Sequence, residues 1–304
     1  MTKRRTAMSD NSYRFTIGAF ECVVVSDGSF AYPHPAQIFF SNAQKDRLEQ
    51  VLREHNCDPI QWEEYISPYP SLAINTGQRW VLIDTGAGDM APTTGNLIAN
   101  LQAEGIAAGD IDTILITHGH PDHIGGNVDN EGNTSFPNAR YVMWKEEWDF
   151  WASEPDLTQL KVDDNIKQLI ITGARKNLPP IQSQLDLVDC ETEIVPGISA
   201  VAAHGHTPGH TAVSIYSRGE QLLCIADSAI HPIHLEQLDW YSVFDLEAKQ
   251  SLASRRRLVE LASAKNALVH ASHFPFPGLG HIIQKDDKWQ WQPIETVSIK
   301  STLS

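Results

Sequence analysis

Four potential metal ligands lie within six residues in the stretch THGHPDHIGG, residues 117–126, and this stretch decides the fold. It directly follows the apolar run ILI at 114–116, which predicts a short buried strand. In extended backbone, residues two apart point to the same side, so His118, His120 and Asp122 converge while the next histidine opens a helix. Imidazole and carboxylate groups at a rigid strand end suit zinc, iron or manganese. The stretch therefore predicts a metal site.

A polar loop with solvent-exposed or hydrogen-bonded histidines is the alternative interpretation of this stretch. Such loops exist, but the density of ligand types directly after a buried strand favours the metal site about ten to one.

The rest of the chain predicts strands and helices grouped in two halves. Alternating apolar residues predict paired strands at 13–20 and 22–25, with Ser26-Asp27-Gly28 as the turn. Helical spacing predicts a helix at 42–55 with Asn42 as its N-cap. Further strands are expected at 71–75, 80–83, 113–116, 140–143, 185–188, 198–203, 212–216, 222–226, 267–270 and 289–293, and helices around 97–101 and at 145–152, 166–177 and 246–264. This order favours an α+β fold with two sheets stacked face to face and helices outside.

Composition limits the classes of partner. The 304 residues carry a formal charge of −15 with lysine and arginine mixed among the acids, so neither nucleic acid nor a membrane surface is an expected partner. The basic run Arg255-Arg256-Arg257 lies in a helical pattern and is predicted to be a solvated face. Four cysteines without a CxxC pair, together with no signal-like or membrane-length apolar run, favour a reducing, cytoplasmic location.

We expect residues 1–12 to be a flexible N-terminal tail and residues 13–304 to form a single domain with a helical insertion at about 42–66. No linker, repeat or low-complexity segment divides the chain. The insertion offers a surface for a second copy, so a homodimer is the predicted assembly.

The motif HxHxDH at 118–123 resembles that of the metallo-β-lactamase-like hydrolases, and the resemblance extends along most of the chain. The segments that carry it elsewhere are NTG at 75–77, LIDTG at 82–86, GHTPGHT at 205–211, IAD at 225–227 and SHFP at 272–275. Each is weak alone, because a lone aspartate after a strand is more often a cap. The order and spacing of these segments together support the resemblance to this family.

This resemblance implies an αββα four-layer sandwich and a centre for two divalent metal ions, with zinc the default and iron, manganese or cobalt possible. The implied ligands are His118, His120 and His206 for one ion, Asp122, His123 and His273 for the other, and Asp227 as a bridge between them. It implies metal-assisted hydrolysis by a bridging hydroxide, with Asp122 or Asp227 passing the proton.

Other histidines and one aspartate are alternative candidates for binding or supporting the metal ions. The family pattern makes His206 the ligand and His210 a support for its loop, and His204 competes because it lies two residues before His206. Asp84 is equally well interpreted as a residue that holds a ligand histidine or as a turn cap. We expect the remaining candidates, His231, His234, His270 and His281, to support ligands or to lie at the surface.

Asp227 also discriminates between branches of the family, because the true β-lactamases would be expected to carry cysteine or serine there. The insertion before Ser71, the long stretch between Asp227 and His273, and the segment 273–280 resemble the methyl parathion hydrolase and N-acyl-homoserine-lactone lactonase branch. The predicted function is hydrolysis of an ester, lactone or phosphotriester of a small, partly apolar substrate. A glyoxalase II-type thioesterase, a β-lactamase-like amidase, and a diiron redox or metal-binding protein are the alternatives.

Aromatic residues near the motifs are candidates for lining an apolar substrate pocket. They are Trp144, Trp148, Phe150, Trp151, Phe274 and Phe276. Packing in the core is the alternative, favoured about two to one for any single aromatic.

Overall fold

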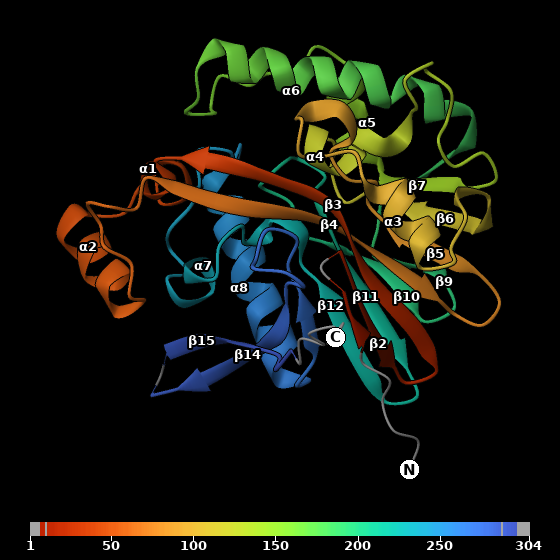
Figure 1. Ribbon diagram of the computed structural model, residues 1–304. Coiled ribbons are helices and arrows are strands. Elements are labelled where there is room, and N and C mark those ends of the chain that lie inside the picture. Colours follow the sequence, from red (N-terminus) through yellow and green to blue (C-terminus); the bar gives the residue numbers. More distant parts are fainter. Residues whose placement is uncertain (1–6, 10, 287, 297–304) are drawn as a thin grey trace, which may run out of the picture.

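The computed structural model describes residues 7–9, 11–286 and 288–296, and it has two stacked β-sheets with helices outside them (Figure 1). The first sheet has eight strands in chain order: β1 (Ala7–Met8), β2 (Ser12–Ile17), β3 (Phe20–Pro33), β4 (Glu64–Asn75), β5 (Trp80–Ile83), β6 (Ile111–Leu115), β7 (Arg140–Trp144) and β8 (Leu185–Val188). Strands β1 to β5 pair antiparallel, and β5 to β8 pair parallel.

The second sheet has seven strands in the order β15 to β9. They are β9 (Thr192–Val195), β10 (Ile198–Ala202), β11 (Thr211–Ser217), β12 (Glu220–Cys224), β13 (Leu268–His270), β14 (Leu279–Lys285) and β15 (Lys288–Pro293). Only β12 and β13 pair parallel within it. Both sheets are thus mixed, as predicted.

Three apolar clusters define four layers. The cluster between the sheets holds Val24 and Leu72 from the first sheet and Val213 and Leu222 from the second. Neighbouring residues in the same strands, such as Val23, face the opposite way into a cluster with the helices, because successive side chains in a strand alternate between faces. Both faces of these strands are buried, which is why their sequences read as nearly continuous apolar runs.

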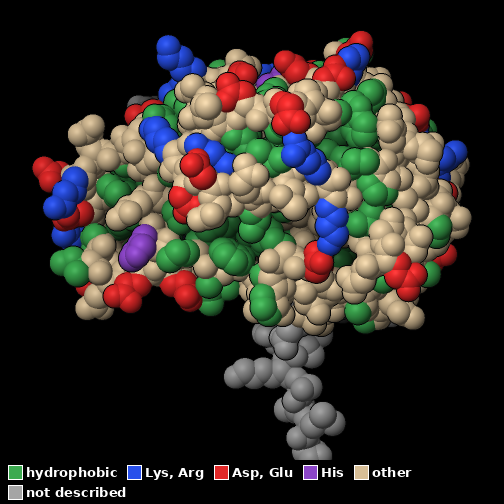
Figure 2. All heavy atoms as spheres, turned by 90° about the horizontal axis from the view of Figure 1, so that it is seen from above, with side chains coloured by type: hydrophobic (Ala, Val, Ile, Leu, Met, Phe, Trp, Pro, Cys, Tyr) green, Lys and Arg blue, Asp and Glu red, His purple; other side chains and the backbone are tan. Residues whose placement is uncertain are grey.

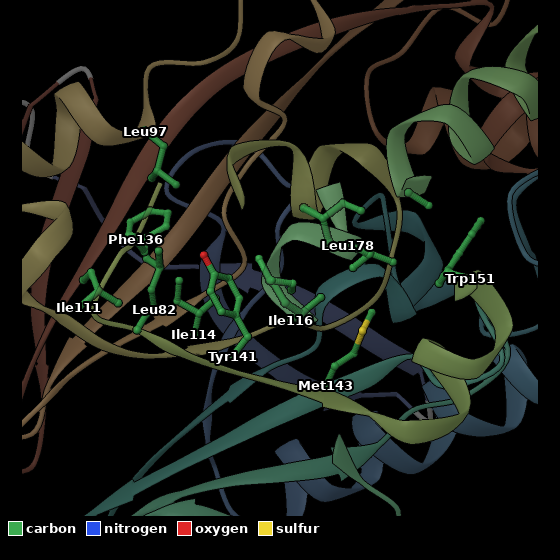
Figure 3. Packing of buried hydrophobic residues seen from close by; sticks show 14 of the residues in the cluster. Leu82, Leu97, Ile111, Ile114, Ile116, Phe136, Tyr141, Met143, Trp151 and Leu178 are labelled. Carbon is green, nitrogen blue, oxygen red and sulfur yellow. The ribbon is translucent and has the colours of Figure 1, made fainter. Parts of the chain in front are cut away.

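The helices cover the outer faces. On the first sheet lie α3 (Leu97–Ala103), α4 (Pro121–Ile124), α5 (Lys145–Ala152) and α6 (Asp164–Asn177), and on the second lie α7 (Ile233–Glu236) and α8 (Ala248–Ala264). Figure 3 shows the first of these packings, in which Leu82, Ile114 and Tyr141 are register partners on three adjacent strands. The αββα four-layer sandwich expected from the resemblance is confirmed.

The predicted turn at Ser26-Asp27-Gly28 was wrong. Strand β3 continues through these residues with a shift in register, and the chain turns instead at Gly18, whose φ is 57°. The Asp27 carboxylate accepts backbone N–H groups of Ala87 and Leu97 at 2.8 Å each, so this polar residue anchors the segment before α3 rather than a turn.

Helix α1 (Pro35–Phe39) lies just before the predicted insertion, and α2 (Lys45–Glu54) lies within it. Helix α2 begins after Gln44, not at Asn42, because the Asn42 amide bonds the backbone of Asp239 and Tyr241 at 2.8 and 2.9 Å. Residues 64–66 belong to β4 rather than to the insertion. Helix α2 projects from the left of the view in Figure 1.

Strands β9 and β14 and helix α1 were not predicted from the sequence. Of the tail predicted over residues 1–12, residues 1–6 and 10 lie outside the described residues, while β1 pairs with β2. Across the described part of the chain, every helix is too short or too polar to cross a lipid bilayer.

Replacing Gly18 by alanine is expected to destabilise the fold. A residue with φ of 57° is strained unless it is glycine, and the added Cβ would lie 2.0 Å from the Ser217 carbonyl oxygen of the second sheet. We expect Gly18→Ala to lower the free energy of unfolding in urea by more than the ~1–2 kcal/mol of left-handed strain alone. Gly77→Ala is the matched control, because its φ is 86° and its Cβ would meet nothing within 4 Å. Equal losses in the two variants would contradict this packing of the turn.

Candidate metal centre

The ends of four strands bring the candidate ligands to one place. Strand β6 leads into the segment that carries His118 to His123, and the β10–β11 connection carries His206. Strand β12 leads into the short 3₁₀ turn η5 (Ala226–Ser228) with Asp227, and β13 leads into His273. Strands β5 and β6 run parallel, as do β12 and β13, so their carboxyl ends meet at common edges.

Seven predicted ligand residues form two adjacent groups. The first is His118, His120, His206 and Asp227, and the second is Asp122, His123 and His273; within each group the ligand atoms all lie within 4.8 Å of one another. In the first, His120 Nδ1 lies 3.1 Å from His118 Nε2 and 3.0 Å from His206 Nε2. The sequence therefore identified every member of both groups.

Asp227 lies between the two groups. Its Oδ1 is 3.1 Å from Nε2 of both His123 and His273, and its Oδ2 is 3.4 Å from His206 Nε2. Asp122 completes the second group, with Oδ2 3.5 Å from His273 Nε2. This placement is that of a carboxylate able to bind an ion on each side.

The chemistry of this cluster fits metal ions. Among the described residues, His120 Nε2 is fully buried and has no hydrogen-bond partner, although buried polar atoms nearly always have one. Several imidazole nitrogens face each other at hydrogen-bond distance, where a central cation would satisfy their lone pairs together. Ligands of this kind must be neutral imidazoles and ionised carboxylates.

Burial and histidine neighbours set the charge states. Burial and the nearby His123 hold the pKa of His118 well below its usual value, and burial with His206 does the same for His120. Burial opposes ionisation of Asp227, but His273 and His123 hold the pKa of this carboxyl well below its usual range. His118, His120 and Asp227 are thus shifted toward the protonation states that metal binding requires, whereas at His123 burial lowers the pKa but Asp227 and Asp122 outweigh it and the net shift is upward.

Asp84 supports a ligand, which resolves its two predicted interpretations. Its Oδ2 accepts a hydrogen bond from His123 Nδ1 at 2.7 Å, and its oxygens also accept from the Thr117 amide at 2.7 Å and hydroxyl at 2.8 Å. Asp84 itself has φ of 59°, a left-handed conformation that aspartate tolerates better than most residues. Such contacts orient the imidazole toward a metal.

Two further supports were not predicted from the sequence. Asp245 Oδ1 lies 3.0 Å from His206 Nδ1, and Ser67 Oγ lies 3.0 Å from His273 Nδ1. Burial lowers the pKa of His206, but Asp245 outweighs it and the net shift is upward. Neither residue stands in a motif, because each comes from a loop or strand far from its histidine in sequence.

The predicted solvated face at 255–257 was wrong for its first residue. Arg255 is buried, and its guanidinium donates to the carbonyl oxygens of Ser228, at 2.6 Å, and Trp240. Its Nη2 lies 3.9 Å from Asp245, so Arg255 links α8 to both the Asp227 turn and the partner of His206.

The remaining histidines stand outside the two groups. His210 donates through Nδ1 to the Ala203 carbonyl oxygen at 3.0 Å and accepts at Nε2 from the Asp227 amide at 3.1 Å, which agrees with a loop-supporting role. His204 packs edge-on against Trp144 and is not in the cluster. The others bond or pack elsewhere: His231 against Phe39, His234 to the Phe39 carbonyl, His270 to Cys224 and His281 to the Ala267 carbonyl.

An apolar pocket of about 310 Å³ opens over the cluster. Its floor includes His120, Asp122, His206, Asp227 and His273. Its walls are Phe30, Tyr32, Pro33, Ile38, Phe39, Ser67, Tyr69, Met90, Pro121, Ile166, Leu169, Ile170, Ile230 and Phe244. None of the aromatics proposed from the sequence is among these wall residues.

The proposed lining aromatics belong mainly to the core. Phe274 is fully buried beside Trp291, and Trp151 lies in the cluster under the helices. Trp144 is buried next to His204, and Trp148, Phe150 and Phe276 are partly buried against the core clusters. Aromatic residues from β3, α1, β4 and the segment before α8 line the pocket instead, and nothing in their local sequence marks them.

Charged side chains of both signs share one face of the molecule. On the face seen from above, acidic and basic side chains are interspersed and no continuous basic area is visible (Figure 2).

Residues 68–273 match the family model described as the metallo-beta-lactamase superfamily. The chain belongs to this superfamily. Among curated proteins, it is 23% identical over 221 residues to an N-acyl homoserine lactonase of Bacillus cereus, a match covering 66% of this chain and 78% of that protein. It is 26% identical over 175 residues to an N-acyl homoserine lactonase of Bacillus sp., a match covering 57% of this chain and 60% of that protein.

Solved structures agree in fold. AidC, a dizinc quorum-quenching lactonase solved with a product, is 28% identical with a TM-score of 0.86 and covers 95% of this chain and 99% of its own. The hydrolase AbOPH, 24% identical with a TM-score of 0.82, covers 96% of this chain and 100% of its own. Superfamily membership and these relatives identify the chain as a metal-dependent hydrolase.

Replacing Asp245 by asparagine is expected to weaken metal binding. The amide keeps the size of the side chain but removes the charge that orients and polarises His206. Loss of such a partner typically lowers metal affinity about ten- to hundredfold. Competition with a chromophoric chelator measures this affinity.

Asp186→Asn serves as the control, because Asp186 is exposed and pairs with Arg140 on the surface. If Asp245→Asn kept its metal affinity and a normal circular dichroism spectrum, the hydrogen bond between Asp245 and His206 would not contribute to metal binding.

Proposed function

We propose that the protein hydrolyses esters or lactones of small, partly apolar substrates, with N-acyl homoserine lactones as the leading class. The observation that carries this proposal is the position of the two ligand groups at the floor of a strongly apolar pocket. Three of the four relatives named above are lactonases by name, which supports the lactone over other esters.

His118, His120 and His206 would hold one ion, Asp122, His123 and His273 the other, and Asp227 both. Two such ions supply a water-derived nucleophile at neutral pH and stabilise the oxygen that gains negative charge. Zinc as the metal, a homodimer and a cytoplasmic location remain predictions of the sequence.

Asp122 is the better of the two candidate proton carriers. Both carboxylates line the pocket, but the side chain of Asp122 is 12% exposed against 5% for that of Asp227. The histidines around Asp227 hold its pKa well below the usual range, so that carboxylate is a poor proton acceptor. Asp122 is therefore the carboxylate that we assign to take the proton released by the attacking water and to pass it to the leaving alkoxide.

Two tyrosines supply hydrogen bonds on the pocket wall. The hydroxyls of Tyr32 and Tyr69 lie 2.8 Å apart, and the Tyr69 ring packs edge-on against His273. Burial raises the pKa of both phenols, so both keep their protons at neutral pH. One hydroxyl donates its proton to the oxygen of the other, and the second hydroxyl is left to donate a hydrogen bond to an oxygen of a bound substrate.

The walls favour an acyl chain over a charged group. Ile166, Leu169 and Ile170 of α6 face the pocket opposite Phe30 and Phe39. Each methylene buried there contributes about 0.8 kcal/mol to binding. A glutathione conjugate, which carries charged groups, has no lysine or arginine to meet among the pocket-lining residues.

The first test is a hydrolysis panel on metal-reconstituted protein. It contains an N-acyl homoserine lactone, an aryl phosphotriester, S-lactoylglutathione and a cephalosporin. We expect the lactone to be turned over fastest, and kcat/KM to rise as its acyl chain lengthens from four carbons to about eight.

In the same assay, His120→Ala and Asp227→Ala should each lower kcat/KM at least about 100-fold, or about 2.7 kcal/mol, because each removes a ligand. His55→Ala, at the exposed end of α2, is the control and should be unaffected. Preference for any other member of the panel would refute the lactone assignment.

Tyr69→Phe tests the tyrosine pair. The substitution keeps the ring and removes one hydroxyl, and loss of a hydrogen bond to a charged oxygen lowers kcat/KM about tenfold or more. Steady-state kinetics with the best substrate of the panel measures it, with Tyr216→Phe on the exposed face of β11 as the control. Equal rates in wild type and Tyr69→Phe would remove this residue from the proposed mechanism.

A further inference from the structure

Glu147 of α5 is a fully buried carboxylate that the proposed mechanism does not use. Its Oε1 accepts hydrogen bonds from the Gly119 amide at 2.9 Å and Trp151 Nε1 at 2.7 Å. Its Oε2 accepts from the Thr207 hydroxyl at 2.7 Å and the Gly209 amide at 2.8 Å. Four donors around one carboxylate offset the cost of burying its charge.

These donors come from two ligand-bearing segments. Gly119 stands between His118 and His120, after a strand of the first sheet, and Thr207 directly follows His206, after a strand of the second. One side chain therefore spans the two segments that together provide the three histidines of the first ligand group.

The backbone confirms that both segments approach α5 closely. A Cβ on Gly119 would lie 2.4 Å from the Trp151 ring, and one on Gly209 would lie 2.3 Å from the Glu147 amide nitrogen. Only glycine fits at either contact. Glu147 is thus not a solvent-facing helix residue that happens to reach a loop.

The second ligand group has other supports. His123 is held by Asp84 and His273 by Ser67, and Glu147 bonds neither of those residues. Glu147 is also absent from the walls of the pocket, so it does not touch substrate.

We propose that Glu147 is a positioning residue that fixes the distance between the His118–His120 pair and His206, and so controls metal affinity at the first group but not at the second. The inference rests on the metal centre of the proposed function. A carboxylate that merely stabilised the fold would affect both groups alike.

Glutamine is the informative replacement because it is isosteric but has one acceptor oxygen and one donor group. The amide nitrogen has to face one of the two donor pairs. The Thr207 hydroxyl can rotate to accept a hydrogen bond, whereas the Gly119 amide and Trp151 indole can only donate. We therefore expect the glutamine oxygen to keep Gly119 and the lost bond to be that of Gly209, which loosens the His206 segment.

The test weakens each ligand group in turn by removing one of its histidines and measures Co²⁺ binding to apoprotein by its visible absorption. In a His273→Ala background the first group remains complete, and Glu147→Gln should weaken Co²⁺ binding at least about tenfold. In a His206→Ala background the second group remains, and Glu147→Gln should change Co²⁺ affinity less than about twofold.

Trp151→Phe is the matched control, since it removes one donor to Glu147 and disturbs the same core but leaves both loops bonded to the carboxylate. It should leave both affinities within about twofold. If Glu147→Gln fails to fold, Thr207→Val removes a single bond to Oε2 and should still weaken the first group selectively.

Equal losses in the two backgrounds, or no loss at the first group, would overturn the inference. Because the measurement is of binding rather than turnover, a failed hydrolysis panel alone contradicts the proposed substrate and leaves the positioning role standing.

Discussion

The structure depends on one buried carboxylate placed between two sets of imidazoles. Asp227 faces His206 on one side and His123 and His273 on the other, and burial of its charge is tolerated only because of those neighbours. The surrounding backbone accepts strain to keep it there: Ala226 has φ of 41°, and the Asp227 amide bonds His210. Strand ends, loop glycines and supporting carboxylates all serve this arrangement.

Much of the fold, and all seven residues that form the two His/Asp groups, could be predicted from the sequence. Strands buried on both faces give unbroken apolar runs, and the centre collects its ligands just after such strands, where histidine and aspartate stand out. The misplaced turn at 26–28 has a physical cause, since Asp27 caps a distant segment and sequence pattern cannot distinguish the two uses of one aspartate.

The supports and the pocket walls could not be predicted in the same way. Asp245 and Ser67 act on histidines that lie 39 and 206 residues away, so only the folded chain brings them together. Tyr32 and Phe39 line the pocket because the end of β3 and helix α1 pack beside the centre, whereas the aromatics nearest the motifs lie in the apolar cores. Proximity in sequence to a ligand does not indicate proximity to substrate.

The division of ligands between the two sheets has a consequence for how the two halves of the chain depend on each other. Residues before β9 supply His118, His120, Asp122 and His123, and residues after it supply His206, Asp227 and His273. Neither half contains a full set for either group. A cut in the connection between β8 and β9 would leave two fragments, each with only part of either ligand group. Metal ions that bind ligands from both fragments would promote their reassociation, so the affinity between the fragments would rise with the metal-ion concentration.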